Sequence, residues 1–105
     1  MYSRNSSILG QIQNKHNELV DLVNDTVPLV EEAASRDILD AEGVDDFNEL
    51  VGSVNEIGES VNELLALTPD ELASAESSDL NDILKTIVEL RPSIAELQRV
   101  LHQEL

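Results

Sequence analysis

Residues 46–66, DFNELVG SVNEIGE SVNELLA, repeat one seven-residue pattern three times. In each heptad an apolar residue is followed by Asn-Glu and then by Leu or Ile. The apolar residues at position a are Phe47, Val54 and Val61, and those at position d are Leu50, Ile57 and Leu64. A repeat of about 3.5 residues keeps one apolar stripe of a helix facing a partner helix along its length. The repeat therefore predicts a helix whose main role is packing.

The apolar stripe of this helix is wider than in a two-stranded coiled coil. Position e carries Val51, Gly58 and Leu65 instead of the usual charged residues. About three apolar positions per heptad are typical of a helix in a bundle. Glycines 52 and 58 should each cost about 1 kcal/mol relative to Ala inside a helix. The helix must gain its stability from tertiary contacts, which favours a multi-helix bundle.

Length and composition indicate one helical domain spanning residues 1–105. The chain has 105 residues, of which 41% are hydrophobic, and only Tyr2 and Phe47 are aromatic, so the core must be aliphatic. With no cysteine, it has neither disulfides nor a thiol nucleophile. The first residues lack the apolar core of a signal peptide, and no apolar run reaches the length of a membrane span. We expect a cytoplasmic or virion protein that is not secreted through a signal peptide.

The charge is strongly negative and unevenly placed. The sequence has 22 acidic and 6 basic residues, a formal net charge of −16, and no Lys or Arg lies between Asp37 and Leu84. Phosphate and anionic membrane binding both need clustered basic residues, so we expect neither direct nucleic-acid binding nor membrane binding.

Two further long helices flank the heptad helix. Apolar residues at helical spacing predict helices over about 7–34 and 79–104, and over 45–66 for the repeat itself. Proline interrupts the first at Pro28 and the last at Pro92, where the helix either bends and continues or breaks. In the last helix the apolar register passes through Pro92, which favours a continuous helix with Pro92 on the solvent side.

The connections contain helix start and stop signals. Gly43 is expected to end a helical segment in the left-handed conformation, and Asp45 to cap the heptad helix. Thr68-Pro69-Asp70-Glu71 is typical of a capped helix start and predicts a short extra helix near 69–75. The predicted fold is all-α: an antiparallel, up-down-up three-helix bundle with coiled-coil-like heptad packing.

Two groups of residues are the candidate binding surfaces. The first is a helix-packing interface made of aliphatic residues and one Phe: Phe47, Leu50, Val51, Val54, Ile57, Val61, Leu64, Leu65, Ile83, Ile87, Leu90, Ile94 and Leu97. The second is an acidic face of the heptad helix: Glu49, Glu56, Glu59 and Glu63. Apolar surface in excess of the core is expected along residues 51, 58 and 65, or along Val23, Val27 and Val30.

No pattern in the sequence predicts a catalytic, cofactor or metal site. If Gly43 stood at the sixth position of a calcium-binding loop, Ile38 would occupy the first position, where a carboxylate is required. His16 and His102 are expected towards opposite ends of the bundle. Nucleophile elbows, phosphate loops and metal-ligand clusters are absent from the sequence. We therefore expect a protein that is not an enzyme.

The function that these features favour is structural. Amphipathic helices would mediate self-association, as a homo-oligomer, or docking to a larger complex, and a small virion component of a tailed virus is one such protein. The alternative is an acidic mimic of nucleic acid that inhibits a basic DNA- or RNA-binding protein. The acidity has three interpretations, namely solubility, adaptation to high salt and mimicry of phosphates.

Overall fold

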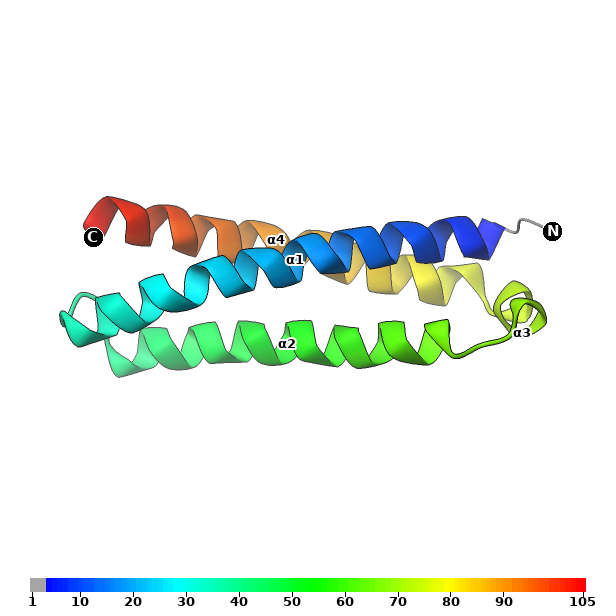
Figure 1. Cartoon of the computed structure of the whole chain (residues 1–105), viewed down its shortest axis with the longest axis horizontal. Coiled ribbons are helices and arrows are strands. Elements are labelled where there is room, and N and C mark those ends of the chain that lie inside the picture. The colour runs from blue at the N-terminus through cyan, green and yellow to red at the C-terminus, as the bar shows by residue number, and fades with distance from the viewer. Residues whose placement is uncertain (1–3) are drawn as a thin grey trace.

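The computed structural model describes residues 4–105, which form helices joined by short turns and contain no strand. Its helices are α1 (Arg4–Ser35), α2 (Ala41–Leu65), the short α3 (Pro69–Ser74) and α4 (Ser77–Glu104). Figure 1 shows α1, α2 and α4 side by side along the long axis of a rod. The rod measures 54 × 19 × 18 Å. The α1–α2 connection lies at one end and α3 at the other, so α1 and α4 run in the same direction and α2 in the opposite one (Figure 1).

The centre of the core is a stripe of α1 residues that recur every seven positions. Ile12, Leu19, Thr26 and Ala33 are all fully buried, and Asn5, one heptad earlier, is 4% exposed. The hydroxyl of Thr26 donates a hydrogen bond to the carbonyl of Leu22 at 2.6 Å, so Thr26 can lie among aliphatic side chains without an unpaired polar group. Matching stripes on the other helices are also buried: Phe47, Val54 and Val61 on α2, and Leu80, Ile87, Ile94 and Leu101 on α4.

The long helices are not equally close to one another. Helix α1 contacts α2, α3 and α4, and its contact with α4 is the most extensive. Helices α2 and α4 contact each other much less than either contacts α1. The first helix is therefore the one around which the bundle packs.

Both prolines lie inside continuous helices. Pro28 is within α1 and Pro92 within α4, and both are exposed. A proline leaves the carbonyl four residues earlier without its helical donor. Those carbonyls belong to Asn24 and Val88, which are exposed, so water can reach them. This explains why neither proline breaks its helix.

The end of α1 differs from the prediction for Gly43. The residue in the left-handed conformation is Asp37, with φ of 59°, whereas Gly43 lies inside α2. The Ile38 amide donates to the Ala33 carbonyl at 2.9 Å, and the Asp37 amide donates to the Ala34 carbonyl at 3.3 Å. This is the Schellman pattern that satisfies the last carbonyls of a helix, with an Asp at the position usually taken by Gly.

Helix α2 also begins earlier than predicted, because Asp40 rather than Asp45 caps it. Asp40 is extended, and its side chain accepts a hydrogen bond from the Gly43 amide at 2.9 Å. A Cβ on Gly43 would meet the Leu39 side chain, which would have to move, so Gly43 allows Leu39 to pack closely and does not end a helix. The first turn of α2 thus includes residues that the sequence placed in a loop.

The short helix α3 forms where it was predicted, and the helix after it begins two residues before its predicted start at residue 79. The hydroxyl of Thr68 accepts from the Glu71 amide at 3.2 Å, and the Glu71 carboxylate accepts from the Thr68 amide at 3.0 Å. These reciprocal bonds make a capping box. Helix α4 then begins at Ser77 without a side-chain cap at Glu76.

Candidate functional site

The predicted helix-packing residues separate into three degrees of burial. Six are buried: Phe47, Val54, Val61, Ile87, Ile94 and Ile57, the last of which is the most exposed of them at 9%. Six are half-buried: Leu50, Val51, Leu64, Ile83, Leu90 and Leu97. Leu65 is 48% exposed and lies outside the core. The predicted interface is therefore partly consumed by the core and partly accessible.

The expected excess apolar surface falls on α2 rather than on α1. Val23 and Val30 are buried, and Val27 is half-buried against the core. On α2, in contrast, Val51 is half-buried and Leu65 is exposed. The other large apolar residues that are exposed within residues 4–105 are Ile38, Val88 and Val100.

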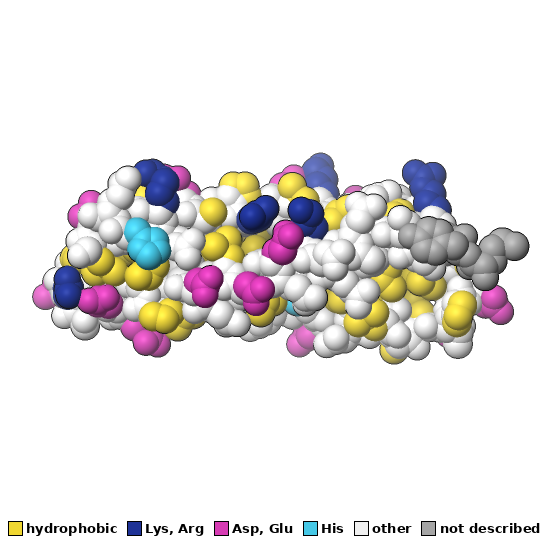
Figure 2. Space-filling model, turned by 45° about the horizontal axis from the view of Figure 1, so that its top comes forward, with side chains coloured by type: hydrophobic (Ala, Val, Ile, Leu, Met, Phe, Trp, Pro, Cys, Tyr) yellow, Lys and Arg dark blue, Asp and Glu magenta, His cyan; other side chains and the backbone are white. Residues whose placement is uncertain are grey.

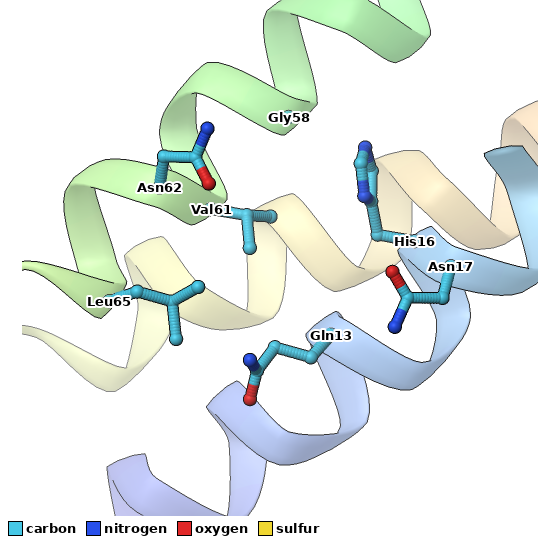
Figure 3. A pocket seen from close by; sticks show the side chains of 7 residues that line it. All are labelled: Gln13, His16, Asn17, Gly58, Val61, Asn62 and Leu65. Carbon is cyan, nitrogen blue, oxygen red and sulfur yellow. The ribbon is translucent and has the colours of Figure 1, made fainter.

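A pocket of about 220 Å³ lies between α1 and α2. It is lined by Gln13, His16 and Asn17 from α1, and by Gly58, Val61, Asn62 and Leu65 from α2. Figure 3 shows the side chains of Val61 and Leu65 directed from α2 towards α1, with amides from both helices around them.

His16 closes one end of this pocket because Gly58 leaves room for its ring. A Cβ on Gly58 would lie 3.3 Å from the Cε1 and Nε2 atoms of His16. Nε2 also lies 3.3 Å from the Val54 carbonyl oxygen, within hydrogen-bonding distance. The pocket thus offers amide and imidazole groups over an aliphatic floor, and neither a hydroxyl nor a carboxylate lines it. Such a lining can form hydrogen bonds with a ligand, but it holds no nucleophile beside a base.

All four residues of the predicted acidic face are exposed on α2: Glu49, Glu56, Glu59 and Glu63. The basic residues lie elsewhere, with Arg4 and Lys15 on α1, Arg36 just after it, and Lys85, Arg91 and Arg99 on α4. Most of the Lys and Arg side chains visible in Figure 2 lie along its upper part, over α1 and α4. Charge is therefore segregated, with α2 and α3 carrying acidic residues and no basic ones.

The ion pairs do not neutralise α2. The four pairs among residues 4–105 join residues three or four apart: Lys15–Glu18, Arg36–Glu32, Lys85–Glu89 and Arg99–Glu96. The hydrogen bonds from Arg99 hold the pKa of the Glu96 carboxyl below its usual value. Each pair connects residues of α1 or α4, or of the turn after α1, and none involves a carboxylate of α2.

A buried polar cluster that the sequence did not predict joins the start of α1 to α3 and α4. The Asn5 side-chain amide donates to the carbonyls of Leu72 at 2.8 Å and Ala75 at 2.7 Å. Its Oδ1 accepts from the Ser77 hydroxyl at 2.7 Å. The first helix was predicted to begin near residue 7, whereas α1 begins at Arg4, so it includes Asn5. Its burial could have been predicted from spacing alone, because Asn5 lies seven residues before Ile12 and so shares the register of the buried stripe.

The described residues bring no candidate metal ligands together. Among residues 4–105, no three His, Cys, Asp or Glu side chains are arranged to hold a metal ion. The loop considered for calcium is occupied by the start of α2, where Asp40 serves as the helix cap. His16 lies at the α1–α2 pocket, and His102 is exposed near the end of α4. None of the described helices is long and apolar enough to cross a membrane.

Comparison of the chain with protein-family models, with curated proteins and with solved structures finds no match.

Proposed function

We propose that this protein is a non-enzymatic structural or assembly protein. It acts as an up-down-up antiparallel three-helix bundle with coiled-coil-like packing, and it docks through apolar helix faces to copies of itself or to a larger complex. A small virion component is the kind of subunit that such a bundle would form. The observation that carries the proposal is the aliphatic surface remaining on a small, highly charged rod: Leu65 is 48% exposed and Val88 52%.

The uncompensated carboxylates of α2 determine how association should depend on salt. Two copies with a formal charge of −16 each repel one another in dilute buffer. Salt screens this repulsion while leaving apolar contacts intact, since the Debye length falls from about 10 Å at 0.1 M to about 3 Å at 1 M. Adaptation to a saline environment is part of the proposal for the same reason.

The test is size exclusion coupled to light scattering at about 0.1 M and 2 M NaCl, with helicity followed by circular dichroism. We expect a helical oligomer at micromolar concentration that forms or strengthens at 2 M NaCl. A helical monomer at every concentration and both salts would refute self-association and leave docking to a different protein as the remaining form of the proposal.

The exposed carboxylates of α2 favour a second candidate function, a mimic of nucleic acid that occupies the basic groove of another protein. Glu49, Glu56 and Glu63 recur every seven residues on the outer side of α2 and are all exposed. Changing all three to Gln should abolish competition with DNA for a basic DNA-binding protein, while circular dichroism stays unchanged. Self-association of the chain depends on apolar contacts and should survive the same triple substitution.

A further inference from the structure

The two sides of α2 face different helices. Gly58, Asn62 and Leu65 lie towards α1, because they line the pocket shared with that helix. Successive residues of a helix are 100° apart, so the stripe of Leu50, Ile57 and Leu64 lies on the other side of the buried residues Val54 and Val61. That other side faces α4, the third member of the bundle (Figure 1).

The angle between successive residues also identifies the side of α4 that faces α2. Helices α1 and α4 run in the same direction. His16 lines the pocket shared with α2, so residues 9, 23 and 30, which are spaced from it by sevens, lie on the same side of α1. With right-handed helices, the stripe of Ile83, Leu90 and Leu97 then lies towards α2, whereas Leu84 and Leu105 lie towards α1. We call the two facing stripes the α2–α4 surface: Leu50, Ile57, Leu64, Ile83, Leu90 and Leu97.

The α2–α4 surface is incompletely covered. Five of its six residues are half-buried, and only Ile57 is buried. This agrees with the small contact between α2 and α4 relative to their contacts with α1. Each stripe runs over 14 residues, about 21 Å at 1.5 Å per residue, which matches four turns of a partner helix.

Small hydroxyl residues border the surface and leave space for a helix backbone. Ser53 and Ser60 lie beside the α2 stripe, and Thr86 beside the α4 stripe. Their hydroxyls donate to the carbonyls four residues earlier, those of Glu49, Glu56 and Asp82. They therefore need no hydrogen-bond partner from another molecule.

Beyond the hydroxyls the rim is acidic on both helices. On α2 it carries Asp46, Glu49 and Glu56, and on α4 it carries Asp79 and Asp82, all of them exposed. No basic residue lies on the α2 rim, because α2 has none. On α4, Lys85 and Arg99 pair with Glu89 and Glu96, which follow Asp82 at seven-residue spacing, so the carboxylates of the α4 rim outside the ion pairs are those of Asp79 and Asp82. A second copy of this chain would bring like charges together along both rims.

We propose that the α2–α4 surface binds an amphipathic helix of a partner protein, whose apolar stripe is flanked on both sides by Lys or Arg. This proposal rests on the docking function proposed above and specifies the occupant. Apolar side chains of the partner helix pack between the two stripes, and its basic side chains meet the carboxylates of the rims. The charges set orientation and raise the association rate, while the apolar contact supplies most of the affinity.

The test uses a synthetic amphipathic peptide of 18 residues with Leu at a and d, Lys at the flanking positions and one Trp. The chain itself has no Trp, so Trp fluorescence reports the peptide alone. A second peptide with Glu in place of Lys is the comparison. We expect saturable one-to-one binding of the Lys peptide, at least tenfold weakening between 50 mM and 500 mM NaCl, and no binding of the Glu peptide at 50 mM.

Two pairs of variants locate the binding. Leu90→Ala should weaken the Lys peptide about tenfold. Leu84→Ala, which truncates an equally half-buried leucine on the side of α4 towards α1, should change it less than twofold. The triple variant Asp46→Asn, Glu49→Gln and Asp82→Asn should weaken binding at 50 mM NaCl and flatten its salt dependence. An equal loss of charge from α1, with Asp21→Asn, Asp25→Asn and Glu31→Gln, should change binding much less. The charge variants alter exposed side chains, so they test the site even if Leu90→Ala unfolds.

Equal binding of the two peptides, or equal effects of the two triple variants, would overturn this proposal. If the chain instead self-associates, and Leu90→Ala abolishes that association, the surface is occupied by a second copy; the docking function then stands and the basic partner is refuted. A chain that stays monomeric at all salts and binds neither peptide would refute both.

Discussion

The substitution Asn5→Ala tests the polar cluster that joins the start of α1 to α3 and α4. It removes three hydrogen bonds with donor–acceptor distances of 2.7 to 2.8 Å, at a position only 4% exposed. At about 1 kcal/mol for each bond, the free energy of unfolding should fall by about 3 kcal/mol. The measurement is urea unfolding followed by circular dichroism at 222 nm.

Asn5→Asp gives a sharper result because it changes only one group. The carboxylate still accepts from Ser77, but it now faces the carbonyl oxygens of Leu72 and Ala75, to which the amide donated. We expect a larger loss than with Ala at pH 7. The pKa of this Asp would be higher in the folded than in the unfolded chain, so stability should recover as the pH falls through the folded pKa and be fully regained below the unfolded value of about 3.9.

Asn14→Ala is the matched control, since Asn14 is an exposed residue of the same helix. It should change the free energy of unfolding by less than about 0.5 kcal/mol. Losses below about 1 kcal/mol for both Asn5 variants, or no pH dependence of the difference between Asn5→Asp and the parent chain, would refute the cluster as a structural clamp.

Four further changes test other parts of the fold. Ile94→Ala, at a fully buried site, should cost about 2–5 kcal/mol in urea unfolding, and a loss under 1 kcal/mol would mean that this stripe is not the core. Asp37→Gly should stabilise the chain by about 1 kcal/mol by relieving the left-handed conformation, seen as a higher urea midpoint. Gly52→Ala should stabilise it by a similar amount, because the added Cβ meets nothing within 4 Å; destabilisation would contradict that open space. Hydrogen bonds from Thr68 lower the pKa of Glu71. The stability that these bonds contribute is therefore present above the unfolded pKa of Glu71 and is lost as the pH falls through its folded pKa. Thr68→Ala should raise the Glu71 pKa in an NMR titration.

The all-helical fold and the short helix after Thr68 were predictable because they depend on local patterns. The heptad repeat of Phe47, Val54 and Val61 has the period of a packed helix, and the capping box at Thr68 is completed within four residues. Both signals are independent of how the rest of the chain is arranged.

Other features depend on contacts between distant residues, and the sequence did not reveal them. Asn5 is polar and near the start, and its burial follows only from carbonyls about 70 residues away. Gly43 was expected in the left-handed conformation because Gly adopts it at no steric cost, yet Asp37 occupies it and Gly43 lies in α2 close to the Leu39 side chain. Incomplete coverage of Leu50 and Leu90 follows from the spacing of α2 and α4, which no single-helix pattern encodes.

The central position of α1 has a consequence for synthesis of the chain. Its fully buried stripe packs most extensively on α4, the last helix to be made, and the Asn5 side chain bonds to a residue 72 positions later. While the chain is being translated, α1 and α2 can pair only as a hairpin that leaves the α4 side of Ile12 and Leu19 in water. The core therefore closes only after α4 leaves the ribosome, and a nascent chain arrested before residue 77 should remain sensitive to protease.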